Sequence, residues 1–73
     1  MLPALYQIDI LEDAMVLFDE DGSSYESEVL TTYGEAIRIV RRWAKRYPLN
    51  VADAYRMVYD HFAAQRDIAN VSN

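Results

Sequence analysis

The chain of 73 residues has no cysteine, only two glycines and two prolines, and a single histidine, His61. Without cysteine, neither a disulfide nor a thiolate–zinc site can stabilise the fold. The longest unbroken apolar run is Ala14–Phe18, far short of the ~20 residues that a membrane-spanning helix requires. The segment Met1–Ala4 lacks the basic region of a signal peptide, so we expect a cytoplasmic protein.

Positive charge is missing from the first half of the chain, because no lysine or arginine precedes Arg38. Residues 1–35 carry nine acids and a net charge of −9, whereas residues 36–73 carry seven bases and a net charge of +4, which together give −5. Five of the seven bases lie between Arg38 and Arg46. An acidic chain of this kind is not expected to bind nucleic acid or anionic membranes without specificity.

The size and the patterning predict one α+β domain over residues 1–73, with a small antiparallel β-β-β sheet followed by two helices packed on one face. The hydrophobic content of 52% is that of a globular protein. Alternation of apolar residues and the turn-forming pair Asp21-Gly22 indicate strands, and a period of 3.6 indicates helices. The predicted strands are 5–11, 14–18 and 25–31, the predicted helices are 33–47 and 51–68, and residues 69–73 are expected to fray.

Both helices have clear start signals. Thr32 and Glu35 fit a capping box for the first helix, Pro48 ends it, and Asn50 can cap the second. The apolar side predicted for the first helix consists of Tyr33, Ala36, Ile37, Ile39, Val40, Trp43, Ala44 and Tyr47. The apolar side predicted for the second helix consists of Val51, Ala54, Tyr55, Val58, Tyr59 and Phe62.

The opposite side of the first helix is entirely basic. It carries Arg38, Arg41, Arg42, Lys45 and Arg46, which we call the basic stripe. A solvated helix face, or neutralisation by the acidic hairpin of the same chain, would explain these charges without a partner. However, four arginines to one lysine favour bidentate contact with carboxylates or phosphates, so we predict that the stripe binds a partner.

The N-terminal segment is a second candidate contact surface, through Met1, Leu2, Leu5 and Tyr6. Alternation places Tyr6, Ile8 and Ile10 on one face, and burial of that face in the core is the simplest interpretation. If the segment is instead a free edge strand, it could add to the sheet of a partner.

The sequence gives little support for a catalytic, metal-binding or DNA-reading site. Only one histidine is present, and no glycine-rich phosphate loop occurs. Asp19-Glu20-Asp21-Gly22 resembles the start of a calcium loop, but Leu30 stands where the twelfth-position glutamate belongs. The second helix would be the reader of a helix-turn-helix, yet its exposed face is mainly acidic. We therefore expect no enzyme, no metal and no cofactor.

The short, acidic, cysteine-free chain, with strands over 5–30 and the basic helix Arg38–Arg46, resembles the small phage-encoded regulators that bind bacterial RNA polymerase, such as an inhibitor and antiterminator from a lytic Xanthomonas phage. The resemblance implies a non-enzymatic transcription regulator that takes part in host takeover. Such a regulator would dock on the large polymerase subunits, inhibit initiation and promote antitermination. Two alternatives stay open, an acidic DNA mimic or anti-defence inhibitor, and nucleic-acid contact through the basic helix.

Overall fold

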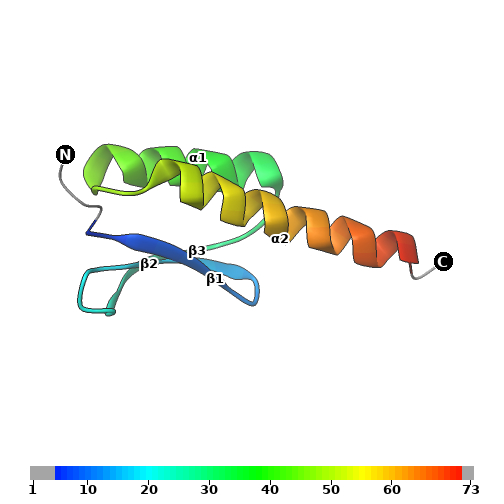
Figure 1. The fold of residues 1–73 in the computed structure, drawn as a ribbon, viewed down its shortest axis with the longest axis horizontal. Helices are drawn as coiled ribbons and strands as arrows, with labels where there is room; N and C mark the ends of the chain where they lie inside the picture. Colours follow the sequence, from blue (N-terminus) through cyan, green and yellow to red (C-terminus); the bar gives the residue numbers. More distant parts are fainter. Residues whose placement is uncertain (1–4, 72–73) are drawn as a thin grey trace.

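The computed structural model describes residues 5–71 and confirms the α+β fold, as a three-stranded antiparallel sheet followed by two helices. The elements are β1 (Gln7–Leu11), β2 (Ala14–Phe18), β3 (Ser24–Val29), α1 (Tyr33–Arg46) and α2 (Val51–Val71). Both helices lie on the same side of the sheet, so that the protein has two layers (Figure 1).

The sheet is a meander in which β2 lies between β1 and β3. Ile8 lies opposite Leu17, and Leu17 lies opposite Glu26. The β2–β3 connection is the predicted tight turn, because Gly22 adopts a φ of 85° that a residue with a side chain rarely accepts. The carboxylate of Asp19 accepts hydrogen bonds from the backbone N–H groups of Asp21 and Ser23, at 2.9 and 3.0 Å. The hairpin of residues 14–31 is thus confirmed, with a bulge at Leu17/Phe18.

The core lies between the inner face of the sheet and the apolar sides of the two helices. Trp43, Met15 and Leu17 are fully buried at its centre. The complete cluster of buried apolar residues is Ile8, Met15, Leu17, Ala36, Ile39, Val40, Trp43, Ala54 and Val58. Because these residues alternate along the strands and recur at helical spacing along α1, the sequence pattern alone predicts most of the core.

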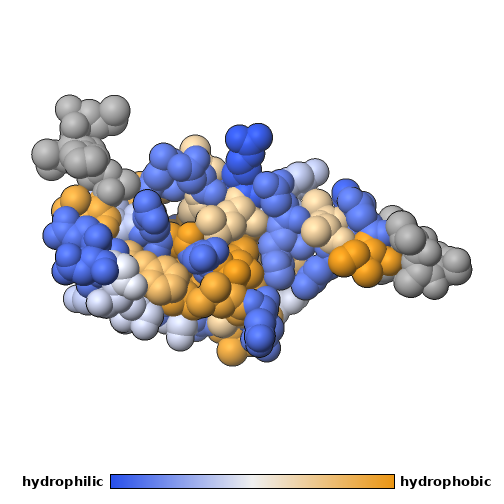
Figure 2. Space-filling model, turned by 60° about the horizontal axis from the view of Figure 1, so that its bottom comes forward, coloured by the Kyte–Doolittle hydropathy of each residue, from blue (hydrophilic) through white to orange (hydrophobic). Residues whose placement is uncertain are grey.

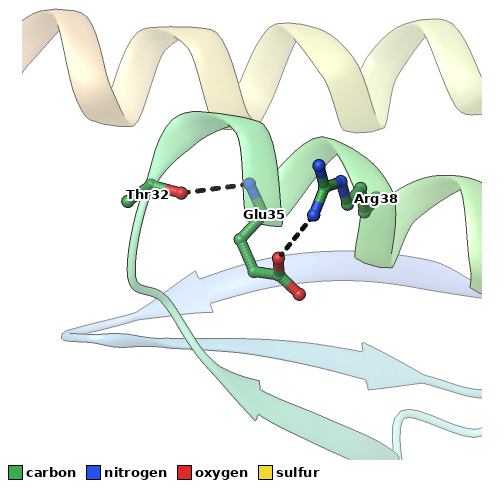
Figure 3. A network of polar contacts seen from close by, with 3 residues as sticks. All are labelled: Thr32, Glu35 and Arg38. Carbon is green, nitrogen blue, oxygen red and sulfur yellow. Dashed lines mark hydrogen bonds and ion pairs between the residues drawn. The ribbon is translucent and has the colours of Figure 1, made fainter.

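Both predicted N-cap residues cap their helices, while the Glu35 carboxylate of the predicted capping box contacts Arg38. The Thr32 hydroxyl accepts a hydrogen bond from the backbone N–H of Glu35 at 3.2 Å (Figure 3). The side-chain oxygen of Asn50 accepts one from the backbone N–H of Asp53 at 3.1 Å. Each cap satisfies a backbone donor that the first turn of a helix leaves without a partner. These two caps determine where α1 and α2 begin.

Several boundaries differ from the prediction. β1 begins at Gln7 instead of at residue 5, because Tyr6 pairs with Leu49 in an isolated bridge and donates its backbone N–H to Pro48. β3 begins one residue earlier and ends two residues earlier than predicted. The second helix continues to Val71, three residues beyond the predicted end at residue 68; residues 72–73 lie outside the described part.

Two tyrosines that were predicted to lie in the core are exposed. The exposed fraction is 44% for Tyr33 and 54% for Tyr59. Tyr33 is the first residue of α1, and Tyr59 lies at the edge of the apolar side of α2, beside the buried Val58. Tyr59 still lies alongside α1, because Phe62, three residues later, packs its ring 5.8 Å from that of Tyr33. The C-terminal part of α2 extends beyond the sheet and beyond α1 (Figure 1), and Ile68, six residues after Phe62, is 68% exposed.

Candidate protein-binding site

The basic stripe lies on the solvent side of α1. All five of its side chains are exposed, whereas the opposite side of the same helix contributes Ala36, Ile39, Val40 and Trp43 to the core. The structure therefore brings together the stripe that the sequence predicts: Arg38, Arg41, Arg42, Lys45 and Arg46.

Two arginines of the stripe pair with carboxylates of the same chain. An Nη atom of Arg42 lies 2.5 Å from a carboxylate oxygen of Glu28 on β3, and this ion pair joins the helix layer to the sheet. Arg38 lies 3.5 Å from Glu35 one turn earlier on α1 (Figure 3). The alternative that the acidic hairpin neutralises the stripe is therefore realised at one position, Arg42.

Two other arginines are held by tyrosines. The Nε of Arg41 donates to the hydroxyl of Tyr55 on α2 at 3.2 Å. The guanidinium carbon of Arg46 lies 5.6 Å from the centre of the Tyr47 ring, within reach of a cation–π interaction. Lys45 forms no ion pair with residues 5–71.

The contacts of Arg38, Arg41 and Arg42 each occupy one nitrogen of the guanidinium group. Because a guanidinium has five N–H donors, the remaining donors are available to another molecule. The side chain of Arg38 is 79% exposed and that of Arg42 is 49% exposed. The contacts therefore orient the stripe without removing it from solvent.

Sequence reasoning missed the role of the two glutamates of β3. Alternation groups Tyr25, Ser27 and Val29 on one face. The structure turns Ser27 and Val29 outward and Glu26 and Glu28 toward the helices, whereas the ring of Tyr25, at the bulge, packs against Tyr6 and Tyr47. Glu26 accepts a hydrogen bond from the hydroxyl of Tyr47 at the end of α1. This hydrogen bond, together with partial burial, raises the pKa of Tyr47. The opposite charges of Glu28 and Arg42 were the only hint of this pairing in the sequence, and the two residues come together only in the folded protein.

The N-terminal candidates separate into different environments. Met1 and Leu2 lie outside the described residues. Leu5 is 43% exposed. Tyr6 is half-buried, with its ring centre 5.0 Å from that of Tyr47 and 5.7 Å from that of Tyr25. Tyr6 therefore packs within the domain, and among the described residues of this segment only Leu5 is largely accessible to a partner.

Other surface features carry less chemistry. His61 contacts Gln65 at 3.2 Å on α2. Residues 5–71 contain no group of three His, Cys, Asp or Glu side chains placed to hold a metal ion. Within the same residues, no helix has the length and apolarity to cross a membrane. A small apolar depression lies between the start of α1 and the neighbouring part of α2, and it is lined by Tyr33, Tyr59, Phe62, Ala63 and Arg66.

Comparisons with known proteins assign no family. No protein-family model, no curated protein and no solved structure matches this chain.

Proposed function

We propose that this protein is a non-enzymatic regulator that acts by binding another protein, and that the basic stripe is its docking surface. The observation that supports this most directly is the orientation of the stripe. Three of its arginines are held by internal contacts through one nitrogen each, while their other donors face solvent. An acidic protein surface, rich in aspartate and glutamate, is the matching target.

Orientation before binding matters for affinity. Ordering a long side chain at an interface costs about 0.5–1.5 kcal/mol, and an arginine that is already restrained loses less of this freedom. Arg41 is restrained by Tyr55 from the neighbouring helix, and Arg42 by Glu28 from the sheet. A planar guanidinium can then engage a carboxylate through two parallel hydrogen bonds. The stripe thus resembles a preorganised surface more than a set of independent solvated charges.

A protein fits this surface better than nucleic acid does. On α2, the helix that packs against α1, Asp53 and Asp60 are exposed and would repel phosphates. The sheet layer, residues 5–31, has no lysine or arginine. DNA mimicry is also less favoured, because Glu26 and Glu28 contact Tyr47 and Arg42 and are not displayed as a free row of carboxylates.

For the partner, we propose bacterial RNA polymerase, on the basis of the resemblance to small phage-encoded regulators. The proposed action is docking on the large subunits in the bacterial cytoplasm, inhibition of initiation and promotion of antitermination. This step rests on the general character of the chain, whereas the docking surface rests on the contacts of α1.

The test is capture of purified bacterial RNA polymerase by the tagged protein. We expect Arg41→Glu combined with Lys45→Glu to weaken capture by at least about 10-fold, the loss that 1.4 kcal/mol produces. The matched control is Arg56→Glu combined with Arg66→Glu, which makes the same change of charge on α2 and should leave capture intact. Circular dichroism verifies that both variants fold. Equal capture by the folded stripe variant and the wild type would rule out the stripe as the docking surface.

A further inference from the structure

The central strand β2 is apolar on both of its faces, although both helices cover the same one (Figure 1). Its sequence, Ala-Met-Val-Leu-Phe, has no polar residue. Met15 and Leu17 point into the core, whereas Ala14, Val16 and Phe18 point to the outer side of the sheet. An antiparallel sheet with one solvated face normally alternates apolar and polar residues, and a strand that is apolar on both faces is typical of burial on both sides. The outer face of this sheet departs from that rule.

Neighbouring strands extend the apolar character of this outer face. The register places Leu11 and Val29 on either side of Ala14. Leu11 is 50% exposed and Val29 is 64% exposed. Val16 is 8% exposed, forms the floor of a shallow depression between Leu11 and Phe18, and has the polar residues Asp9 and Ser27 on either side. Figure 2 shows an apolar area over the sheet with hydrophilic groups near its ends. We call the set Leu11, Ala14, Val16, Phe18 and Val29 the outer sheet face.

The rim of the outer sheet face is acidic. Asp9 lies on the face itself, opposite Val16. Glu12 and Asp13 form the β1–β2 turn at one end, and the exposed acids Glu20 and Asp21 belong to the β2–β3 turn at the other end. Residues 5–31 contain no lysine or arginine that could balance these charges. The outer sheet face thus combines apolar residues with carboxylates at both ends and with Asp9 beside its middle row. It is complementary to an amphipathic surface that carries cations at both of its ends and along one side.

We propose that the outer sheet face docks a basic amphipathic helix of a partner protein. The dimensions agree, because three strands spaced about 4.8 Å apart offer a surface about 10 Å wide, which is the diameter of one helix. Five-residue strands are about 17 Å long, which corresponds to roughly 11 helical residues or three turns. A helix of that length places lysine or arginine near both acidic turns while its apolar side covers Leu11 and Val29.

A second copy of this chain fits the same face poorly. Face-to-face packing of two copies would bring the acidic rims of both together, with no lysine or arginine from residues 5–31 to separate them. Like charges placed opposite each other oppose association. Anionic lipid or nucleic acid would meet the same repulsion. The surface is distinct from the basic stripe, which lies on the other side of the molecule, so the proposal gives the chain a second docking site of opposite charge preference.

A peptide of leucine and lysine tests this directly. The probe has roughly 14 residues, or about four helical turns, with its leucines at helical spacing on one side. One control peptide has the same composition in shuffled order, and another replaces every lysine by glutamate. Isothermal titration calorimetry measures binding to the wild type, and amide chemical shifts locate the contact. We expect binding of the first peptide with shifts on β1–β3, and no binding of either control.

Matched variants connect the binding to the outer sheet face. Leu11→Ser combined with Val29→Ser should weaken binding by at least about 10-fold, because two exposed apolar contacts are removed. Tyr33→Ser combined with Ile68→Ser removes two exposed apolar side chains from the helix layer and should leave the affinity unchanged. The stripe variant Arg41→Glu/Lys45→Glu should also bind the peptide normally. A failure of the proposed function of the basic stripe can therefore be distinguished from a failure of peptide binding by the outer sheet face.

Four results would overturn the proposal. They are no binding by the folded wild type, equal binding of the glutamate peptide, unchanged affinity of the Leu11→Ser/Val29→Ser variant, and chemical shifts confined to α1 and α2. Analytical ultracentrifugation of the wild type without peptide shows whether the protein is a monomer or a dimer. A dimer that disappears in the Leu11→Ser/Val29→Ser variant would assign the face to a second copy and would also overturn the proposal.

Discussion

Replacing Trp43 by phenylalanine should cost unusually little stability for a change at the centre of the core. Trp43 is fully buried, and its indole N–H has no hydrogen-bond partner among residues 5–71. A buried donor without a partner costs about 1–3 kcal/mol. The substitution removes two ring carbons, worth about 1.6 kcal/mol of burial at ~0.8 kcal/mol each, and leaves a small cavity worth about 1 kcal/mol. It also removes the donor, so that the net loss falls between about zero and 1.5 kcal/mol.

Two further variants provide reference values for the loss of unfolding free energy in Trp43→Phe. Ile39→Val deletes a single methylene from the same core and should cost about 0.5–1.5 kcal/mol. Trp43→Ala should cost about 3–5 kcal/mol, which is a large part of the roughly 4–11 kcal/mol expected for a domain of this size. Urea unfolding followed by circular dichroism measures all three. A loss above about 2.6 kcal/mol for Trp43→Phe, the sum of the burial and cavity costs, would refute this prediction, because removal of the indole N–H would then give no gain.

Three further predictions concern the contacts around α1 and α2. A double-mutant cycle with Arg42→Ala and Glu28→Gln should give a coupling of about 0.5–1 kcal/mol in urea unfolding, as expected for a half-exposed pair, and a coupling of zero would show that the pair contributes nothing. The pKa of Tyr47 is raised above its ordinary value of 10.0, so the stability that the Tyr47 hydroxyl contributes is complete below pH 10 and is lost as pH rises through the folded pKa. Tyr47→Phe should therefore show a smaller loss of unfolding free energy above pH 10 than the wild type does. Parallel curves of unfolding free energy against pH for the two proteins would contradict this. Asn50→Ala should lower the unfolding free energy by about 1 kcal/mol while Asn50→Asp keeps it, and equal effects of the two substitutions would argue against the cap.

The sequence predicts the order and type of all five elements, because each has a strong local signal. Thr32 and Asn50 cap helices through hydrogen bonds to residues three positions later, and such contacts involve no distant part of the chain. Gly22 provides the positive φ of the hairpin turn. The basic stripe is equally predictable, since helical spacing alone places its five cations opposite Trp43.

The contacts between layers could not be predicted in the same way. Alternation along β3 separates Glu26 and Glu28 from Tyr25 and Val29, but it does not state which set faces the helices. That choice depends on Arg42 and Tyr47, which lie more than a dozen residues away and donate hydrogen bonds to the two glutamates only in the folded protein.

The exposure of Ile68 has a related cause. An apolar pattern along a helix shows which side would be buried, but not where the covering layer ends. α2 is 21 residues long and β2 only five, so the helix extends past the sheet and leaves Ile68 68% exposed.

The two proposed docking surfaces should act independently, because the fold separates the charges that the sequence divides. The basic stripe consists of exposed side chains of α1, and both helices lie on one side of the sheet (Figure 1), so the outer sheet face is turned away from the helix that carries the stripe. The two shorter dimensions of the backbone are 22 and 17 Å, about twice the Debye length of ~8 Å at physiological salt. Screening therefore keeps each surface from weakening the other, even though they have opposite charge. A variant with both Arg41→Glu/Lys45→Glu and Leu11→Ser/Val29→Ser should lose polymerase capture and peptide binding by the same factors as the separate variants, because distant sites are additive. A departure of more than about 0.5 kcal/mol from additivity would show instead that the two surfaces communicate through the Arg42–Glu28 pair, the ion pair between the layers.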